Sequence, residues 1–485
     1  MTACGRWAVA GLCAVAGWAA SAGGAASPAA TPADATGVPA ELAGAIPGVM
    51  AKGGVPGVAV AVVRGGVLVG TGGFGVVRSG GTAAVTPDTV FAATSLGRPV
   101  FAYAVLRLAA RGGLDLDRSL SDYAGNDGVL DERIRRVTAR RVLSETTGFP
   151  DRPRGRELTI DSEPGERFSP SAEGYLYLQK AVEAVTGLPL DEFVRREVFG
   201  PLGMAASSYV WRPESATGAV GHDYLQQPVA TRLPANADAA ESLYTTASDY
   251  GRFLAQMLHP TALDAATVAR MFKPEVKVEP GLAWGLGWGL EPGGSRSLFW
   301  DWGNGRDSGA FAAGRRDTAD GIVVLTNSEN GLSVAEPIVA AVVGDVHPVF
   351  AWLGVDRYDS PARTIRERLV RAGAANGEQG VYRTLKELER TYPAAAFGES
   401  LLNTIGYDLL AQKRPGAAAL VLERNVKLHP KSWNAYDSLA EAYAAAGDVR
   451  SAIRTYRKSL ALNPDNGNAR AALRVLEEAR PRPRR

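Results

Sequence analysis

Short β-branched runs separated by glycine turns dominate the early part of the chain. Val58–Val63 is one such run, Arg64-Gly65-Gly66 follows, and Val67–Val69 resumes the pattern. Two apolar runs joined by glycines predict a β-hairpin. Much later, Ile322–Leu325 forms another apolar run, bounded by Gly321 and Asn327, which is typical of a buried strand.

From Ser95 the spacing of apolar residues changes to that of a helix. The apolar positions are Val100, Phe101, Ala104, Val105, Leu108 and Ala109, before Gly112-Gly113. Pro99 is tolerated only in a first turn, so this helix is expected to begin near Ser95. Further helices are predicted over Tyr175–Val185, Ala247–Met257 and Leu263–Phe272. Strands at both ends with helices between them predict an α/β fold, an α+β sandwich whose sheet joins the two ends.

Beyond about residue 355 the strand signal disappears and an internal repeat emerges. Pro430 and Pro464 occupy equivalent positions of successive units, and the best unit has helices at Trp433–Ala446 and Ser451–Leu462. These units resemble tetratricopeptide repeats, which form an all-α array. A degenerate unit is expected in 364–393, because three stacked units are the usual minimum for stability. The array either caps the first domain or offers a groove to a protein or peptide partner.

Composition and charge argue against several classes of function. The chain has 485 residues and a formal net charge of +2, so no strong basic field points to nucleic acid. Both cysteines, Cys4 and Cys13, lie in an apolar N-terminal stretch, and the four histidines are far apart. No metal site and no cofactor are therefore expected.

The N-terminus has the pattern of an export signal. Arg6 precedes an apolar stretch, and Ala20-Ser21-Ala22 offers a small-residue cleavage site. A signal peptide over 1–22 and a flexible linker over 23–39 are expected, with the protein exported to the periplasm or the extracellular space. No membrane association is expected unless this segment stays uncleaved.

Ser95 is the strongest candidate for a catalytic residue. It ends an extended segment and begins the predicted helix, where the helix N-terminus favours negative charge. On position alone, an ordinary N-cap serine is the favoured interpretation. The segments around Ser95 and further along the chain favour a catalytic role instead. In order, they are Val55-Pro56-Gly57-Val58, Phe91 to Ser95, Leu143 to Gly148, Pro164 to Phe168, Phe199 to Met204, Leu243 to Thr246 and Gly321 to Asn327.

This ordered series resembles the serine β-lactamase and penicillin-binding-protein-like family, especially its class C and esterase branch. The resemblance covers about 40–345 and implies a β-lactamase/transpeptidase-like domain over 40–350, a linker over 351–363 and the repeats over 364–480. It also implies Ser95 as the candidate nucleophile of a serine hydrolase acting on an ester, amide or β-lactam.

Each of the three motifs that the family uses is altered. Ser-x-x-Lys reads Ser95-x-x-Arg98, and arginine cannot act as a base near neutral pH, although it can hold an anion. The motif tyrosine aligns with Pro170, which has no donor or base, and the third position of that motif with Ala172. Tyr175, which matches a packing residue, and Glu173 are poor substitutes.

The third motif, Lys-Thr-Gly or His-x-Gly in the family, aligns with Asp301-Trp302-Gly303. An aspartate there would oppose an oxyanion or pair with Arg98, so a fixed Arg98–Asp301 ion pair that inactivates the site is one hypothesis. Trp302 and Trp284 are candidates to line a substrate cleft, although core packing is the commoner role of such tryptophans.

Three functional interpretations remain open. The favoured one is an exported pseudoenzyme with a degraded site that binds a small ester, amide or peptide ligand, or a partner, as a scaffold. The alternative is an active or weakly active esterase, D-amino-acid peptidase or β-lactamase that works through a Ser95 acyl-enzyme. In the third, the repeats assemble proteins and the first domain is structural.

Overall fold

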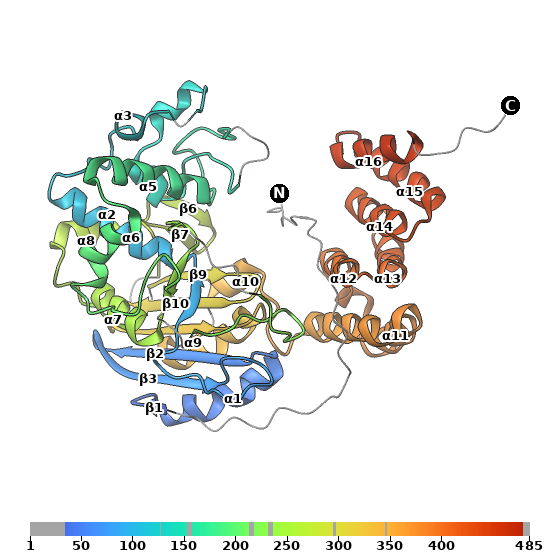
Figure 1. The fold of residues 1–485 in the computed structure, drawn as a ribbon, viewed down its shortest axis with the longest axis horizontal. Coiled ribbons are helices and arrows are strands. Elements are labelled where there is room, and N and C mark those ends of the chain that lie inside the picture. Colours follow the sequence, from blue (N-terminus) through green and yellow to red (C-terminus); the bar gives the residue numbers. More distant parts are fainter. Residues whose placement is uncertain are drawn as a thin grey trace.

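The computed structural model describes residues 34–478, apart from 127, 153–157, 213–217, 231–235, 294–296 and 345–346. The expected signal peptide at 1–22 therefore lies outside the described residues. A large mixed domain and a separate all-helical array make up the chain, with α11 (Pro361–Thr391) placed between them (Figure 1). Among the described helices, none has the length and apolar character needed to cross a bilayer.

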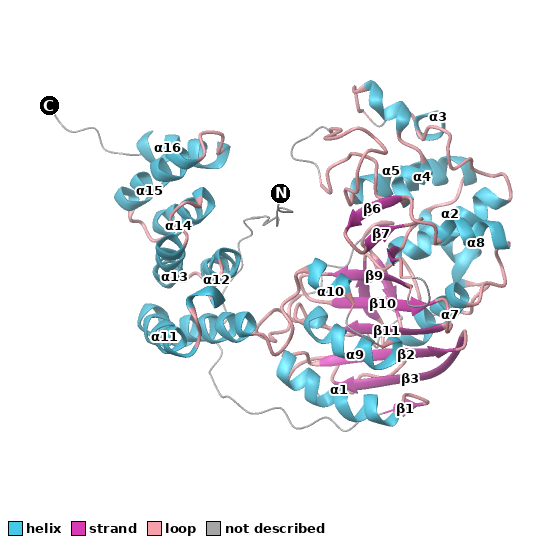
Figure 2. Ribbon diagram, turned by 180° about the vertical axis from the view of Figure 1, so that it is seen from behind, coloured by secondary structure: helices cyan, strands magenta, loops and turns pink. Residues whose placement is uncertain are grey.

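A nine-stranded antiparallel sheet forms the centre of the first domain (Figure 2). Its order is β1-β3-β2-β11-β10-β9-β8-β7-β6, and β4 and β5 form a separate pair. The strands are β1 (Asp34–Thr36), β2 (Gly57–Arg64), β3 (Val67–Gly75), β4 (Phe91–Thr94), β5 (Leu243–Thr245), β6 (Val276–Glu279), β7 (Leu282–Trp284), β8 (Gly289–Glu291), β9 (Leu298–Asn304), β10 (Gly309–Arg315) and β11 (Asp320–Thr326).

The predicted hairpin is present as β2 and β3. Gly65 and Gly66 between them have φ of 55° and 78°, which is why glycines occupy the turn. β2 also pairs with β11, with Val60 opposite Val324, so the sheet joins the two ends of the domain as predicted.

Helices cover both faces of the sheet, because successive side chains of a strand point to opposite sides. Ala59 and Ala61 of β2 belong to the core under α2, α5 and α7, whereas Val58 and Val60 belong to the core under α1, α9 and α10. The helices are α1 (Ala40–Gly53), α2 (Gly97–Ala110), α3 (Ser121–Ala124), α4 (Ala139–Leu143), α5 (Ala172–Thr186), α6 (Leu190–Val194), α7 (Ala247–Leu258), α8 (Ala265–Met271), α9 (Ala335–Val343) and α10 (Pro348–Leu353).

Two expected linkers differ from the structure. Asp34–Thr36, expected in a flexible linker, forms β1 and pairs with β3, whose edge would otherwise be unpaired. The linker expected over 351–363 is shorter, because α10 runs to Leu353 and α11 begins at Pro361. Trp352 of α10 packs against Trp300 with ring centroids 5.5 Å apart, which holds this segment on the first domain.

The C-terminal array consists of paired helices. α11 contains a break at Gly377, with φ of 57°, so it is two helices joined at a kink. The others are α12 (Glu399–Ala411), α13 (Pro415–Leu428), α14 (Trp433–Ala445), α15 (Val449–Leu462) and α16 (Gly467–Glu478). The bounds of α14 and α15 agree with the repeat predicted from the sequence.

Arg366 of α11 joins the two parts of the chain. Its guanidinium lies 2.7 Å from Asp408 of α12 and 3.3 Å from Glu329 of the first domain. It also stacks 3.8 Å from the ring centroid of Tyr224. A second arginine, Arg363, donates to the carbonyl of Gly53. Charge and aromatic contacts therefore fix the array on the first domain.

Removing this junction is expected to destabilise the protein. Arg366→Ala should lower the free energy of unfolding by about 2 kcal/mol, because two carboxylates lose a charged hydrogen-bond partner. The matched control is Arg368→Ala, which breaks an exposed pair with Glu387 and should cost less than about 1 kcal/mol. Urea denaturation followed by tryptophan fluorescence measures both, and equal losses would contradict the junction's importance.

Candidate active site

Ser95 lies in the turn between β4 and α2. Thr94 before it has φ of 49°, a left-handed conformation that turns the chain sharply out of the strand. Leu96, not Ser95, is the N-cap residue of α2, and no side chain caps this helix. The interpretation of Ser95 as an N-cap is therefore wrong. Within the described residues its half-buried hydroxyl makes no hydrogen bond, so it is not committed to a structural role.

The third motif lies directly beside this turn. A Cβ on Gly303 of β9 would come within 2.2 Å of the Ala93 carbonyl oxygen and 2.3 Å of Thr94 Oγ1. Only glycine fits there. The structure thus brings together the two segments that the sequence singled out, Phe91–Ser95 and Asp301–Gly303.

Arg98 faces a set of partners other than the one expected. Its Nη1 donates to Glu145 Oε1 at 2.9 Å, and its Nε donates to the Ala240 carbonyl at 3.3 Å. Asp151 lies 3.9 Å from Nη2, and the guanidinium carbon lies 5.1 Å from the ring centroid of Tyr175. The side chain is only 11% exposed. Arg98 is thus held as one member of a buried ion pair.

The hypothesis of an Arg98–Asp301 ion pair is wrong, because Glu145 takes the guanidinium. Asp301 is buried at 2% exposure. Its Oδ1 accepts from the backbone N–H of Trp302 at 2.9 Å, while its Oδ2 has no hydrogen-bond partner among the described residues. Asp301 therefore acts on Arg98 only through its electric field.

Glu145 is the site residue that sequence reasoning missed. It has φ of 55° and is 2% exposed. Its Oε2 accepts from the Ser171 N–H at 2.9 Å, and its backbone carbonyl accepts from the Ser169 N–H at 2.7 Å. It thus ties the loop that carries Pro170 to Arg98. The available signal was its place in Leu143 to Gly148, one of the segments that carry the family resemblance.

Burial dominates the electrostatics of these groups. Desolvation raises the pKa of Glu145 to about 7, despite the opposing effect of Arg98. Burial is the largest single effect on Arg98 and lowers its pKa, but the charges of Glu145, Tyr175, Asp301 and Asp151 together outweigh it and raise that pKa. Burial also raises the pKa of Asp301 well above its usual range. The net result is an arginine that keeps its proton next to carboxyls that are reluctant to ionise.

The second motif contributes no proton donor. Pro170 is half-buried in the loop, and Ala172 opens α5, capped by Ser171 Oγ, which accepts from the Gly174 N–H at 3.0 Å. Tyr175 is fully buried, and its hydroxyl has no hydrogen-bond partner among the described residues. Burial raises the pKa of that hydroxyl well above its usual value, so it holds its proton firmly.

The tryptophans beside the third motif form a cluster. Trp284 is 2% exposed and lies 5.6 Å from Trp300 between ring centroids, so it packs in the core and does not line a cleft. Trp302 is half-buried and packs edge-on against Trp352 at 5.4 Å. Phe168 packs on Trp284 at 5.2 Å and thereby joins the second-motif loop to the cluster. Within the described part of the chain, there is no group of three or more histidine, cysteine, aspartate or glutamate side chains that could hold a metal ion.

Comparisons with known proteins identify relatives of both parts of the chain. The Beta-lactamase family model matches residues 42–345, and a Tetratricopeptide repeat model matches residues 433–474. Penicillin-binding protein 4 of Amycolatopsis lactamdurans is 29% identical over 326 residues, covering 58% of this chain and 82% of the relative.

Solved structures share the fold. The octameric penicillin-binding protein homologue from Pyrococcus abyssi aligns with a TM-score of 0.55 at 21% identity, over 68% of this chain and 81% of the homologue. A β-lactamase/D-alanine carboxypeptidase from Pseudomonas syringae aligns with a TM-score of 0.55 at 18% identity, over 61% and 97%. The chain belongs to the β-lactamase family and carries C-terminal tetratricopeptide repeats.

Proposed function

We propose that this chain is an exported member of its family in which the Ser95 site no longer supports efficient acyl transfer, and that it acts as a binding scaffold. One observation carries the proposal. The residue at the position of the family's lysine, Arg98, is buried in an ion pair with Glu145. A guanidinium in that state cannot accept the proton of the Ser95 hydroxyl.

The other two motif positions support the same conclusion. Pro170 offers neither a base nor a proton donor, and Asp301 is buried with a pKa well above its usual range. A positioned general acid or base typically raises the reaction rate by a factor of about 10²–10⁴. Without these groups, slow acylation driven by binding and oxyanion stabilisation is the most that Ser95 would retain.

Ligand binding at the site is supported by the Ser95 hydroxyl. It is half-buried and makes no hydrogen bond within the described residues, so it can contact a bound small ester, amide or peptide. The atoms Thr94 Oγ1, Tyr175 Oη and Asp301 Oδ2 also have no hydrogen-bond partner among the described residues, but they are shielded from solvent and offer a ligand no contact in this structure.

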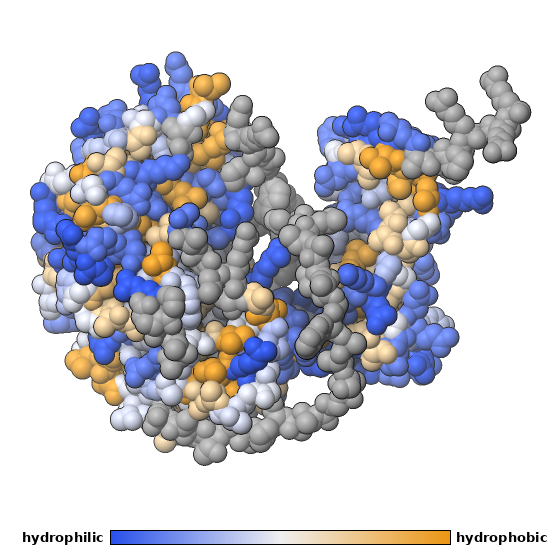
Figure 3. All heavy atoms as spheres, viewed as in Figure 1, coloured by the Kyte–Doolittle hydropathy of each residue, from blue (hydrophilic) through white to orange (hydrophobic). Residues whose placement is uncertain are grey.

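The helical array supports a role with a protein or peptide partner. Tetratricopeptide repeats generally mediate contacts between proteins. Apolar side chains gather at the C-terminal end of the array, over α15 and α16 (Figure 3), where Val475 is 66% and Leu462 is 37% exposed. Such a patch on a folded surface is typical of an interaction site.

Intact-mass spectrometry tests the loss of acylation. The protein is treated with a fluorophosphonate and, separately, with a penicillin, beside Ser95→Ala. We expect no stoichiometric adduct on the unmodified chain within hours. A single adduct that forms within minutes and disappears in Ser95→Ala would overturn the proposal and support the alternative, an active hydrolase working through a Ser95 acyl-enzyme.

A further inference from the structure

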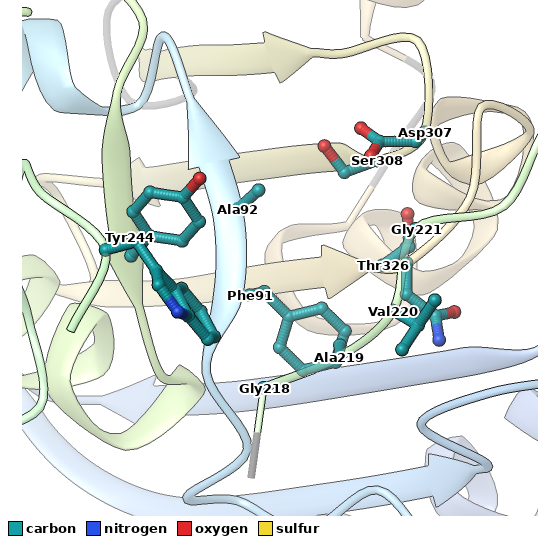
Figure 4. Close-up of a pocket in the computed structure, with 12 residues that line it drawn as sticks. Phe91, Ala92, Gly218, Ala219, Val220, Gly221, Tyr244, Asp307, Ser308 and Thr326 are labelled. Carbon is teal, nitrogen blue, oxygen red and sulfur yellow. The ribbon is translucent and has the colours of Figure 1, made fainter. Parts of the chain in front are cut away.

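A cavity that does not include Ser95 lies between β4, β5 and the turn that joins β9 to β10 (Figure 4). Its volume is about 200 Å³. That is smaller than the roughly 300–1,000 Å³ of sites for drug-sized molecules, so it suits a small ligand with a single ring or a branched chain. Tyr244 and Ala92 lie on one side, and Asp307 and Ser308 lie across from them.

Aromatic rings form much of the wall. Trp211 and Tyr244 meet edge to face, with centroids 5.2 Å apart, and Phe91 adds a third ring. Gly218 makes this packing possible, because a Cβ there would lie 2.2 Å from the Trp211 ring. Aromatic walls attract organic cations through the negative faces of their rings.

Asp307 and Asn327 supply acceptors to the cavity, and the Ser308 hydroxyl, which has no hydrogen-bond partner among the described residues, can also donate. Asp307 is half-buried and forms no ion pair within the described part of the chain. The backbone of Gly221 approaches so closely that a Cβ there would lie 2.2 Å from Asp307 Oδ2. Asn327 is 2% exposed and uses its amide N–H groups on the carbonyls of Val76 and Val77, which leaves its Oδ1 without a partner among the described residues.

No protein cation balances Asp307. Its charged neighbour in sequence, Arg306, is exposed and makes no ion pair with a described residue. The nearby His222 accepts from the Ser79 N–H through Nε2 and contacts the Asn327 carbonyl through Nδ1, an arrangement that fits the neutral ring. Burial lowers the pKa of His222 further.

From the aromatic walls, the unpaired carboxylate and the free amide oxygen, we infer that this cavity binds a small organic ammonium ion, with its apolar body against Trp211 and Tyr244 and its charged group at Asp307. This is a second binding site, independent of what happens at Ser95. A half-buried carboxylate without a cationic partner is costly, so a ligand that supplies the cation gains the missing ion pair.

Calorimetric titration of the full chain with matched probes tests the inference. The probes are 2-phenylethylammonium, neutral 2-phenylethanol and anionic 3-phenylpropionate. The ammonium should bind at least tenfold more tightly than the alcohol, and the anion most weakly. Equal affinities, a preference for the anion, or no heat from the ammonium at millimolar concentration would overturn the inference.

Two variants locate the binding. Asp307→Asn should bring the ammonium and the alcohol to within about twofold of each other, whereas the control Asp465→Asn, on the exposed surface of the array, should change nothing. Trp211→Leu should weaken the ammonium at least fivefold and provides a second readout if Asp307→Asn lowers the thermal midpoint. A preference that survives both variants would place the ligand elsewhere and overturn the assignment.

Discussion

Replacing Glu145 with alanine is expected to lower the free energy of unfolding by about 3–5 kcal/mol at pH 8, where the carboxylate is ionised. The loss arises because Arg98 would remain buried, at 11% exposure, without its counter-charge. The Ser171 N–H would also lose its acceptor. Chemical denaturation of the full chain measures the change.

Two comparisons isolate the cause. Asp122→Ala breaks the exposed pair with Arg118, in which both side chains are about half exposed, and should leave the free energy of unfolding almost unchanged, because solvent screens such a pair. The double variant Arg98→Met, Glu145→Leu removes both charges and should recover most of the lost stability, since apolar replacements of a buried pair are often neutral or stabilising. A double variant as unstable as Glu145→Ala would show that the uncompensated charge is not the cause.

The pH dependence has a definite sign. The folded chain holds the Glu145 proton with a pKa of about 7, above the ordinary value of about 4.3. The folded state therefore binds more protons than the unfolded state in this interval, and this group's contribution to stability falls as pH rises from about 4.3 to 7. Glu145→Ala should lose that part of the slope.

Local sequence patterns predicted the fold well. The hairpin at Arg64–Gly66 and the strand 321–327 depended on β-branched runs and glycines, which act over a few residues. The helices α14 and α15 followed from apolar spacing and a repeat. Each of these signals is contained in a short window, so no tertiary information was needed. The edge strand β1 was missed because its pairing with β3 is long-range, and its composition is that of a linker.

The candidate site was predicted only in part. The ordered segments located Ser95, Arg98 and Gly303, and the structure brings their segments together. The sequence did not indicate which carboxylate pairs with Arg98, because Glu145 and Asp301 are both far from Arg98 along the chain. The choice depends on how the loop before α5 closes over the arginine, which is a property of the packed fold.

The pairing of Arg98 with Glu145 determines which substitutions are needed to restore acylation of Ser95. Arg98→Lys, Pro170→Tyr and Asp301→His restore the three motif positions that the sequence identified. In that triple variant the new lysine would still face Glu145 in a buried ion pair, which would hold it protonated and unable to act as a base. We therefore expect the triple variant to form little penicillin adduct.

Adding Glu145→His to the triple variant removes the carboxylate counter-charge from beside the new lysine. Acylation of Ser95 by a penicillin should then rise by about 10²–10⁴ over the unmodified chain, the usual contribution of a positioned base. Time-resolved intact mass measures the rate, with Ser95→Ala in the quadruple background as the control. Equal acylation rates in the triple and quadruple variants would mean that Glu145 does not keep residue 98 protonated. A gain in rate confined to the quadruple variant would show that the ion pair with Glu145 is what prevents acylation of Ser95.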